Sequence, residues 1–397
     1  MSFSKRRTVL AAAVTITAMV GSVAIAGSAA SAATASEQLS GKRYVALGDS
    51  YAAGYGLPPY SATPAPGCLR SADSIAHRIA ATYGLDLSDV SCTGATIANV
   101  VSSPQTVAGA PVPVQLDAVT NDTTLVTVTI GGNDSRFSSV LSSCVAASPA
   151  GPLLQDPTAA NCAAQYGSQL GAAIQGVVEP ALDGMLAAIR QKAPGAALIV
   201  LGYPALAPSD AAVPATGCFS SALGTGVPPL PQNAFPFTEV DRSYFAGLSA
   251  QLDAAQRASA ARNGATFVSV LEASDTHSQC TGSTEPYLNG VTLQSLTPPT
   301  LAEGAMHPNA AGASFLTAQL SAAIDEAFPE TAAGPAAGET PPATPVGADS
   351  SATVSASGPT RELAATGTDA LSGTVIGLLA LVTGSAALMA RRRRRSV

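Results

Sequence analysis

Short runs of apolar and β-branched residues recur through the middle of the chain, each bounded by turn-forming residues. Most of these runs are continuously apolar, which is the pattern of strands that are buried on both faces of a parallel sheet. We therefore predict buried strands over residues 44–47, 85–90, 125–130, 198–201 and 267–270.

Longer alanine-rich segments with helical spacing lie between these runs, over residues 74–83, 171–191, 244–263 and 309–328. Gly264 stands directly after the third segment, where a helix commonly stops. Strands that alternate with helices indicate a doubly wound α/β sheet. Because such sheets collect functional groups at the carboxyl ends of their strands, the residues just after each strand are the first candidates for chemistry.

Residues 1–32 carry a different pattern. Basic residues 5–7 precede an apolar run from residue 9 to about residue 26, and Ala30-Ser31-Ala32 follows as a small-residue cleavage pattern. This order predicts a secretory signal peptide that is cleaved at its end, with a transmembrane helix as the alternative. The pair Arg6-Arg7 leaves both the twin-arginine route and the general secretory route open.

The other end of the chain holds a second apolar segment. Residues 371–390 are uncharged and long enough to span a bilayer, and Arg391–Arg395 would hold the tail on the cytoplasmic side. Just before the span stands the pentapeptide Leu363-Ala364-Ala365-Thr366-Gly367. Pentapeptide, span and basic tail, over residues 363–397, resemble a sortase cell-wall sorting signal of the actinobacterial Leu-Ala-x-Thr-Gly variety.

That resemblance implies two partners, a sortase and peptidoglycan. The sortase would cut the bond between Thr366 and Gly367 and join the threonine carboxyl to the peptidoglycan. Ala364 stands where the commoner sortase pattern has proline, so which sortase reads the signal is open. A plain single-span membrane anchor is the alternative, and with either anchor the preceding part of the chain faces outward.

Residues 331–362 consist mostly of Ala, Pro, Gly, Thr and Ser, with few large apolar side chains. A segment of this composition cannot bury a core, so it predicts a flexible, semi-extended linker. The linker separates the predicted folded domain, residues 41–330, from the sorting signal. No internal repeat is visible.

The composition suits a chain with a large core, because 47% of its 397 residues are hydrophobic and only 11% are charged. The formal net charge is −7, and residues 41–330 carry 10 basic and 21 acidic residues, a balance of −11. Such a domain has neither a basic face for nucleic acid nor an affinity for anionic lipid headgroups. We expect a soluble acidic monomer with no nucleic-acid partner.

All six cysteines lie within the predicted domain, at Cys68, Cys92, Cys144, Cys162, Cys218 and Cys280. None forms a Cys-x-x-Cys pair or has the spacing of metal ligands, and an exported domain meets an oxidising environment. Disulfides are therefore predicted, with free thiols as the alternative. Of the 15 pairings that six cysteines allow, the plainest is sequential: Cys68–Cys92, Cys144–Cys162 and Cys218–Cys280.

Polar motifs follow the first three predicted strands, and a fourth stands near the end of the domain. The motifs are Gly48-Asp49-Ser50-Tyr51, Cys92-Thr93-Gly94-Ala95, Gly131-Gly132-Asn133-Asp134 and His307-Pro308-Asn309. Together they supply a serine nucleophile, oxyanion donors and a histidine base where a doubly wound sheet exposes chemistry. In order and placement they resemble the motifs of SGNH hydrolases of the GDSL esterase and lipase family, over about residues 41–328.

The resemblance implies a fold and a role for each matching residue. The fold is a flavodoxin-like three-layer α/β sandwich with a five-stranded parallel sheet. Ser50 matches the nucleophile and His307 the base that activates it. The oxyanion hole comprises Ser50, through its backbone N–H, with Gly94 and Asn133. No metal and no cofactor is implied.

These residue types suit acyl transfer. A serine hydroxyl is a weak nucleophile until an imidazole, whose ordinary pKa is about 6.5, takes its proton. The tetrahedral intermediate carries a negative oxygen that needs donors already in place. The Gly-x-Ser-x-Gly elbow of α/β-hydrolases is absent from the sequence, which argues against that fold as the scaffold for the serine.

One position departs from the family pattern. Most members have an aspartate three residues before the histidine, where this chain has Gly304, and the nearest acid is Glu303. In some actinomycete relatives, which also have three sequential disulfides, a main-chain carbonyl two residues before the histidine orients the ring. Here that carbonyl belongs to Ala305. We predict a Ser50/His307 dyad oriented by Ala305, with Glu303 as the alternative third member.

The chain has two other histidines. His77 lies in the predicted helix 74–83 beside Arg78, as a helix-surface residue is expected to do. His277 lies in a loop between Asp275 and Cys280 and would approach the site only if the last disulfide folds it there. His307 is therefore the predicted base.

Further residues near the motifs have expected roles in structure or binding. Asp49 and Asp134 are expected to fix their turns through local hydrogen bonds. Tyr51 and Tyr55 are candidates for lining an acyl pocket. The proline-rich loops 57–66 and 222–236 are candidates for the border of a cleft.

The sequence thus predicts an extracellular serine esterase or lipase that cleaves carboxylic esters by an acyl-enzyme route. A carbohydrate acetylesterase acting on cell-wall or plant polysaccharide is the alternative, because a wall location would suit it and no loop carries a signature that separates lipid from sugar. A non-catalytic surface-binding module is the third hypothesis. The complete set of motif residues argues against it, since a binding module needs no nucleophile and base.

Overall fold

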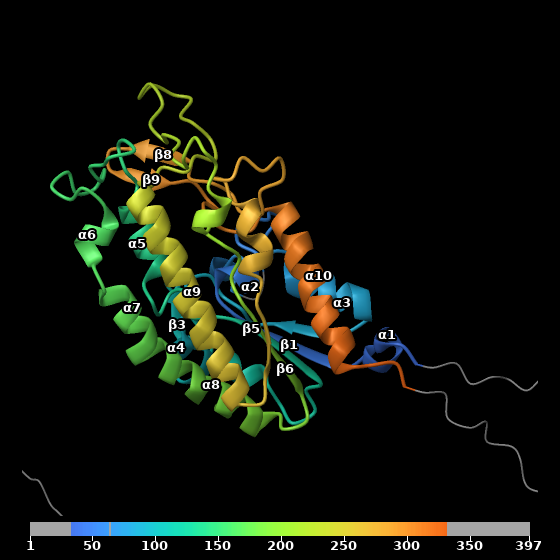
Figure 1. Cartoon of the computed structure of the whole chain (residues 1–397). Helices are drawn as coiled ribbons and strands as arrows, with labels where there is room; N and C mark the ends of the chain where they lie inside the picture. The colour runs from blue at the N-terminus through green and yellow to red at the C-terminus, as the bar shows by residue number, and fades with distance from the viewer. Residues whose placement is uncertain (1–32, 63–64, 332–397) are drawn as a thin grey trace, which may run out of the picture. The chain divides into compact units, whose positions relative to one another are not determined.

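A computed structural model describes residues 33–62 and 65–331 of the chain (Figure 1). The predicted signal peptide, residues 1–32, and the predicted sorting signal, residues 363–397, lie outside the described residues. The predicted linker lies outside them as well, apart from residue 331.

Within the described residues, five strands form one parallel sheet in the order β2-β1-β5-β6-β7. The strands are β1 (Arg43–Gly48), β2 (Asp86–Asp89), β5 (Leu125–Thr129), β6 (Ala197–Leu201) and β7 (Thr266–Val268). Each of the five predicted runs overlaps one of these strands, with ends that differ by at most two residues. The predicted α/β fold with a five-stranded parallel sheet is confirmed.

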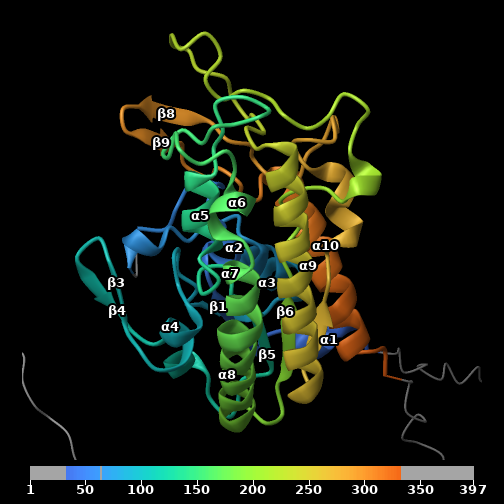
Figure 2. The ribbon, with the colours of Figure 1, turned by 60° about the vertical axis from the view of Figure 1, so that its left-hand side comes forward.

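A layer of helices covers each face of the sheet (Figures 1 and 2). Successive strand residues point to opposite faces, so the apolar residues of one strand pack against both layers. Tyr44, Ala46, Leu125 and Ile199 pack against a layer of α1 (Ala35–Leu39), α3 (Ile75–Tyr83) and α10 (Ala310–Ala327). Val45, Leu47, Val126 and Val128 pack against a layer of α4 (Ile97–Val101), α8 (Glu179–Lys192) and α9 (Glu239–Arg262). The result is the predicted three-layer sandwich.

The predicted helix 171–191 is divided in the structure. It comprises α7 (Gln169–Ala173), a π-helical turn η3 (Ile174–Val178) and α8. By length and composition alone, the stretch Gln169–Lys192 is also the one among the described residues that could cross a membrane. One side of α8 nevertheless buries Leu182 and Met185 in the core, as a helix of a globular domain does.

Shorter elements connect this framework or extend it at the carboxyl ends of the strands. They are α2 (Ser50–Ala53), η1 (Pro66–Cys68), the hairpin β3 (Gln105–Val107) and β4 (Ala110–Val112), η2 (Gln115–Ala118), α5 (Phe137–Ser143), α6 (Cys162–Tyr166), η4 (Asp210–Ala212), η5 (Glu272–His277), and the hairpin β8 (Leu293–Leu296) and β9 (Pro299–Leu301). Of these, α2, α5 and β9 lie near the predicted site.

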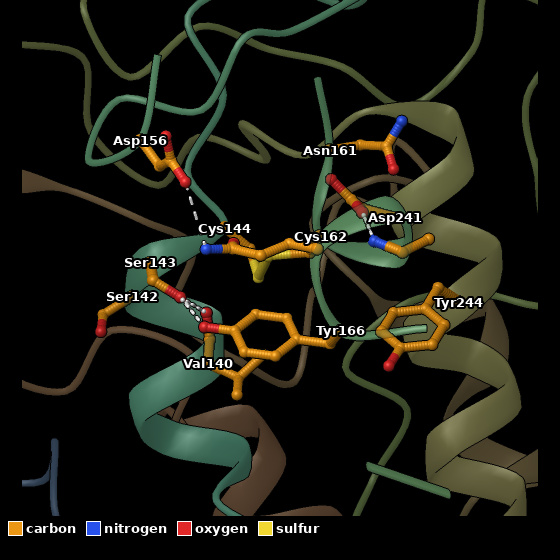
Figure 3. The surroundings of a disulfide bond; sticks show 12 residues. Val140, Ser142, Ser143, Cys144, Asp156, Asn161, Cys162, Tyr166, Asp241 and Tyr244 are labelled. Carbon is orange, nitrogen blue, oxygen red and sulfur yellow. Dashed lines mark hydrogen bonds between the residues drawn. A yellow bond between two sulfur atoms is a disulfide. The ribbon is translucent and has the colours of Figure 1, made fainter. Parts of the chain in front are cut away.

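The six cysteines are paired sequentially in the structure, as Cys68–Cys92, Cys144–Cys162 and Cys218–Cys280. Figure 3 shows how the second bridge joins the end of α5 to the start of α6. There Asp241, in the first turn of α9, accepts a hydrogen bond at 2.9 Å from the backbone N–H of Ala163. A loop closed by such a bridge is stabilised by roughly 3 kcal/mol.

The two ends of the described domain lie together. An antiparallel bridge joins Ala33 to Thr331, and the Gln38 side chain donates to the carbonyl of Pro329 at 2.9 Å. Leu39 of α1 is fully buried, so the folded part includes residues before position 41. Hydrogen bonds therefore join the N-terminal and C-terminal ends of the described domain.

Candidate active site

Ser50 lies at the sharp turn between β1 and α2. Gly48 ends the strand at φ 134°, and a Cβ there would lie 2.3 Å from the carbonyl oxygen of Thr129, so a side chain does not fit. Asp49 is the N-cap of α2 and accepts from the backbone N–H of Tyr51 at 2.9 Å. Ser50 is thereby the first residue of a helix, where its own N–H has no acceptor within the helix.

His307 approaches Ser50 from the loop before α10. Its Nε2 atom lies 2.8 Å from Ser50 Oγ, and its Nδ1 atom lies 2.9 Å from the carbonyl oxygen of Ala305. A carbonyl can only accept, so Nδ1 carries the proton in the neutral ring and Nε2 is left to accept from the serine hydroxyl. This is the tautomer that a general base needs.

The Glu303 carboxylate accepts a hydrogen bond from the Tyr60 hydroxyl, and the Ala305 carbonyl, rather than Glu303, is the partner of His307 Nδ1. Gly304, the position at which the family usually has aspartate, adopts φ 73°. A Cβ at this position would come within 2.7 Å of the Gly56 Cα atom. Backbone packing therefore leaves no room at position 304 for a carboxylate.

Tyr51 holds the segment that carries the base. Its hydroxyl donates to the carbonyl of Met306 at 2.5 Å, while the Met306 N–H donates to the Asn289 carbonyl at 3.0 Å. Met306 adopts φ 61°, which is uncommon for a residue with a side chain. These two bonds fix the strained turn from which the next residue, His307, points at Ser50.

Burial tunes the base. His307 is almost entirely enclosed, and the loss of water lowers its pKa to about 4, although the bond to the Ala305 carbonyl raises it in part. The ring is consequently neutral at pH 7 and able to take a proton.

The two remaining motifs lie on neighbouring loops. Gly94, at φ 79°, belongs to the loop after β2. Asn133 follows β5, and its Nδ2 donates to the carbonyl of Ala95 at 2.9 Å. Asp134 accepts from the N–H of Ile97 at the start of α4, at 3.1 Å. Asp134 thus binds across to the neighbouring loop, whereas a local bond was expected, and both residues join the β5 turn to the loop that carries Gly94.

Tyr203, two residues after β6, is a site residue that the motif comparison missed. Its hydroxyl donates to Asp49 Oδ2 at 2.5 Å and accepts from the Gly132 N–H at 3.1 Å. Burial raises the pKa of Asp49 to about 7, against the opposing effect of the Tyr203 hydrogen bond. Tyr203 joins the nucleophile turn to the turn that carries Asn133. The position of Tyr203 just after a predicted strand was the sequence feature that could have identified it as a candidate.

A cavity of about 240 Å³ lies beside Ser50 and His307. Much of its wall is apolar and comes from α5, β9, α9 and the loops after β6 and before α10, with Leu141, Leu206, Leu252, Leu301 and Met306 as the large side chains. Tyr51 and Tyr55 line it as well, as predicted. Among the described residues, neither proline-rich loop, 57–66 nor 222–236, contributes to this lining.

The other histidines lie away from the cavity. His77 Nδ1 bonds Ser74 Oγ at 2.9 Å at the start of α3. His277 stacks on Tyr287 with ring centroids 4.0 Å apart. Within the described part of the chain, no group of three or more His, Cys, Asp or Glu side chains is placed to hold a metal ion.

Residues 46–314 match the GDSL-like Lipase/Acylhydrolase family. A lipase of Streptomyces coelicolor, Lipase 2, is 35% identical over 274 residues, which cover 68% of this chain and 81% of the lipase. A lipase of Streptomyces rimosus is 30% identical over 303 residues, which cover 76% of this chain and 94% of the relative.

Two solved structures are similar to the described domain. One is an extracellular lipase from Streptomyces rimosus, with TM-score 0.54 and 29% identity, covering 71% of this chain and 99% of the lipase. The other is a phospholipase A1 from Streptomyces albidoflavus, with TM-score 0.53 and 28% identity over the same shares. Each neighbour corresponds over 99% of its length to 71% of this chain. The two neighbours therefore fold without the part of this chain that they do not match.

Proposed function

Because the chain belongs to the GDSL-like lipase/acylhydrolase family and is therefore a carboxylic ester hydrolase, we propose that it works through an acyl-enzyme formed on Ser50. The observation that carries this proposal is the line of hydrogen bonds from Ser50 Oγ through His307 to the Ala305 carbonyl, beside a largely apolar cavity. Neither a metal ion nor a cofactor takes part in the proposed steps.

In the first half-reaction, His307 Nε2 takes the proton of Ser50 Oγ while that oxygen attacks the ester carbonyl carbon. The carbonyl electron pair moves onto the oxygen, which becomes an oxyanion. The N–H groups of Ser50 and Gly94 and the side-chain amide of Asn133 are its proposed donors. The imidazolium that forms keeps its Nδ1–H bond to the Ala305 carbonyl, which holds the ring in place.

When the intermediate collapses, the carbon–oxygen bond to the alcohol breaks and His307 returns its proton to the leaving oxygen. A water molecule then repeats the sequence on the acyl-enzyme. His307 takes one proton from the water, the hydroxide adds to the acyl carbon, and Ser50 leaves with the proton. The carboxylic acid is released and the enzyme is regenerated.

For the substrate, we propose esters with an apolar acyl chain. Leu141, Leu206, Leu252 and Leu301 provide a wall that favours methylene groups over sugar hydroxyls. The similar proteins described as lipases and as a phospholipase A1 support this choice. We therefore propose acylated lipids, rather than acetylated polysaccharide, as the substrate class.

We further propose that the enzyme acts outside the cell. Residues 1–32 would direct export, residues 331–362 would tether the domain, and the signal at 363–397 would attach it through Thr366 to the wall. Wall attachment requires that muramidase release the protein and that detergent leave it in place. Release of the uncut chain by detergent would instead identify a membrane anchor.

The ester function is tested by comparing the full chain with Ser50→Ala on p-nitrophenyl acetate and longer p-nitrophenyl esters. We expect the variant to lose hydrolysis while keeping its thermal unfolding midpoint, since only a hydroxyl is removed. Acid-quenched samples of the unchanged chain should contain the acyl mass on the Ser50 peptide. Hydrolysis by the variant would contradict the proposed nucleophile.

A further inference from the structure

The catalytic cavity has a polar wall on the side of α9. Leucine and methionine side chains form much of the lining, but α9 adds Ser249, Asp253 and Gln256 to it. These positions are four and three residues apart, so they lie on one face of the helix together with Leu252. Neither the acyl transfer proposed above nor an acyl chain made only of methylene groups makes use of these polar side chains.

Gln256 brings a buried acceptor to this wall. The residue is 1% exposed, and its Nε2 donates to the carbonyl oxygen of Ile130 at 2.9 Å. Because a carbonyl can only accept, this bond fixes which end of the amide is the oxygen. Among the described residues, that oxygen, Oε1, has no hydrogen-bond partner. Buried polar atoms in proteins are nearly always paired, so this wall holds more acceptors than the protein itself satisfies.

Asp253 is a stronger acceptor on the same wall. Its side chain is 15% exposed, its Oδ1 accepts from the Ser269 hydroxyl at 2.6 Å, and its Oδ2 lies 3.3 Å from an Arg257 nitrogen. A carboxylate has about four acceptor positions, so Asp253 can bind a further donor. Hydrogen bonds to an ionised group are roughly twice as strong as those between neutral groups. Asp253 is therefore suited to hold a hydroxyl group.

Asp253 lies some way along the cavity from the nucleophile. A Cβ on Gly202, the residue after β6, would stand 3.5 Å from Asp253 Oδ1, whereas Ser50 follows β1. Only β5 lies between β1 and β6, and neighbouring strands are about 4.8 Å apart, so the two strand ends are about 10 Å apart. An extended chain advances about 1.2 Å per bond, so roughly eight bonds span this distance.

Asp253 also borders a second cavity, of about 340 Å³, on the side of η5. Ser209, Arg257, Ser269 and Asp275 contribute polar groups to the lining of that cavity. A methyl group at the end of an acyl chain would meet polar surroundings here, whereas a hydroxyl group would be hydrogen-bonded. The cavity therefore favours a chain that is apolar near the ester and polar about eight carbons away.

We propose that the α9 wall is a hydroxyl-binding subsite, which makes the enzyme prefer esters whose acyl chain carries a hydroxyl group about eight carbons from the carbonyl. The Asp253 carboxylate accepts the hydrogen of that hydroxyl, and the Ser249 hydroxyl donates to its oxygen. The leucine side chains hold the methylene groups between the hydroxyl and the ester. The proposal rests on the ester hydrolase function proposed above and narrows its substrate class.

The test compares three dissolved p-nitrophenyl esters with the full chain: octanoate, 8-hydroxyoctanoate and 3-hydroxyoctanoate. We expect kcat/KM to be about tenfold higher for 8-hydroxyoctanoate than for octanoate, because only the former bonds the Asp253 carboxylate. The 3-hydroxyoctanoate should show no such preference, because its hydroxyl lies too close to the ester to reach Asp253. Equal kcat/KM values for octanoate and 8-hydroxyoctanoate would overturn the subsite.

Variants assign the preference to the α9 wall. Asp253→Asn should lower the ratio of the kcat/KM values for 8-hydroxyoctanoate and octanoate to about one. Ser249→Ala, which leaves the bonds of Asp253 in place, should lower the ratio about threefold. Asp183→Asn is the matched control, because Asp183 is a helix carboxylate that is paired with Arg262 at 2.9 Å and does not line the cavity. A ratio that Asp253→Asn leaves unchanged would overturn the proposal.

A second pair of esters shows which part of the substrate carries the hydroxyl. If 1-octanoylglycerol is preferred over propyl octanoate, and Asp253→Asn removes this preference while the acyl pair shows none, the hydroxyl belongs to the alcohol and the acyl assignment is overturned. No cleavage of p-nitrophenyl octanoate would overturn the catalytic function itself, because that ester needs no hydroxyl subsite. Cleavage without any preference would overturn the subsite alone.

Discussion

The two sides of the active site are held in different ways. On the base side, Ser50 and His307 are bonded to each other directly, and the Ala305 carbonyl fixes the ring from behind. On the oxyanion side, Gly94 and Asn133 lie on two loops that are bonded to each other. The positions of these two residues relative to the substrate therefore depend on the packing of the two loops.

This difference separates two kinds of contribution to the proposed reaction. The base side is assembled before substrate arrives, because its members satisfy one another in the free enzyme. The oxyanion side acts only when charge develops on the substrate, and its accuracy comes from backbone geometry and from links such as Tyr203. Substitutions on the two sides should therefore differ in size and in the kinetic constant that they change.

Among substitutions that keep Ser50 and His307, the largest effect is expected on the oxyanion side. Asn133→Ala should lower kcat by roughly 10²- to 10³-fold with little change in KM, because it removes a donor that the transition state needs. Asp134→Ala is the matched control, since it breaks the neighbouring bond to Ile97 but keeps the amide. If Asn133→Ala changed KM alone, Asn133 would be a binding residue.

The bond between the two sides can be broken at Tyr203. Tyr203→Phe keeps the ring but leaves the Gly132 N–H and Asp49 Oδ2 without the hydroxyl that joins them. A buried bond of this kind is worth about 1–2 kcal/mol, so kcat should fall about five- to thirtyfold. KM for a dissolved ester should stay constant if Tyr203 positions catalytic groups, whereas a rise in KM alone would make it a substrate contact.

Below pH 6, the pH profile examines the protonation of His307 on the base side. Because burial lowers the pKa of His307 to about 4, the ring stays neutral as the pH falls from 7 to 5 and becomes protonated below about 4. The value of kcat/KM should be level from pH 6 to pH 5, below the range near pH 7 in which the buried Asp49 carboxyl titrates, and about tenfold lower at pH 3 than at pH 5. Circular dichroism at each pH separates this titration from unfolding. A decline that begins near pH 6.5 would show an exposed histidine.

Sequence reasoning predicted the parts of this arrangement that depend on local pattern. Short apolar runs encode the buried strands and so mark the segments just after them, and the family resemblance of the motifs in those segments named Ser50, Gly94 and Asn133 as candidates. The role of the Tyr203 hydroxyl could not be assigned in this way, because its partners Asp49 and Gly132 lie far away in sequence and meet it only across the sheet.

Close contacts between backbone segments could not be predicted from the sequence either. The sequence shows that position 304 is glycine, but the reason lies in its contact with Gly56, which depends on how two loops pack. The hairpin β8–β9 was also missed, because its strands are too short and polar for an apolar run to mark them. In both cases, contacts between residues far apart in the sequence determine the structure, and a local sequence pattern does not reveal such contacts.

The smallest effect is expected for Glu303→Gln, which tests whether the base side needs a carboxylate. Glu303 is bonded to Tyr60, and His307 Nδ1 has the Ala305 carbonyl at 2.9 Å. A neutral isostere keeps an acceptor for Tyr60 and disturbs neither Ser50 nor the oxyanion donors. We therefore expect kcat/KM on p-nitrophenyl acetate to fall by less than about tenfold.

If Glu303 instead turns toward His307 during the reaction, its charge would stabilise the imidazolium as a triad carboxylate does. Its loss would then cost on the order of 10³- to 10⁴-fold. Tyr60→Phe supplies the control, because it frees the carboxylate without removing it and should leave kcat/KM nearly unchanged. A large loss in Glu303→Gln with a small one in Tyr60→Phe would contradict the dyad, since only a carboxylate acting on the ring produces that pair of results.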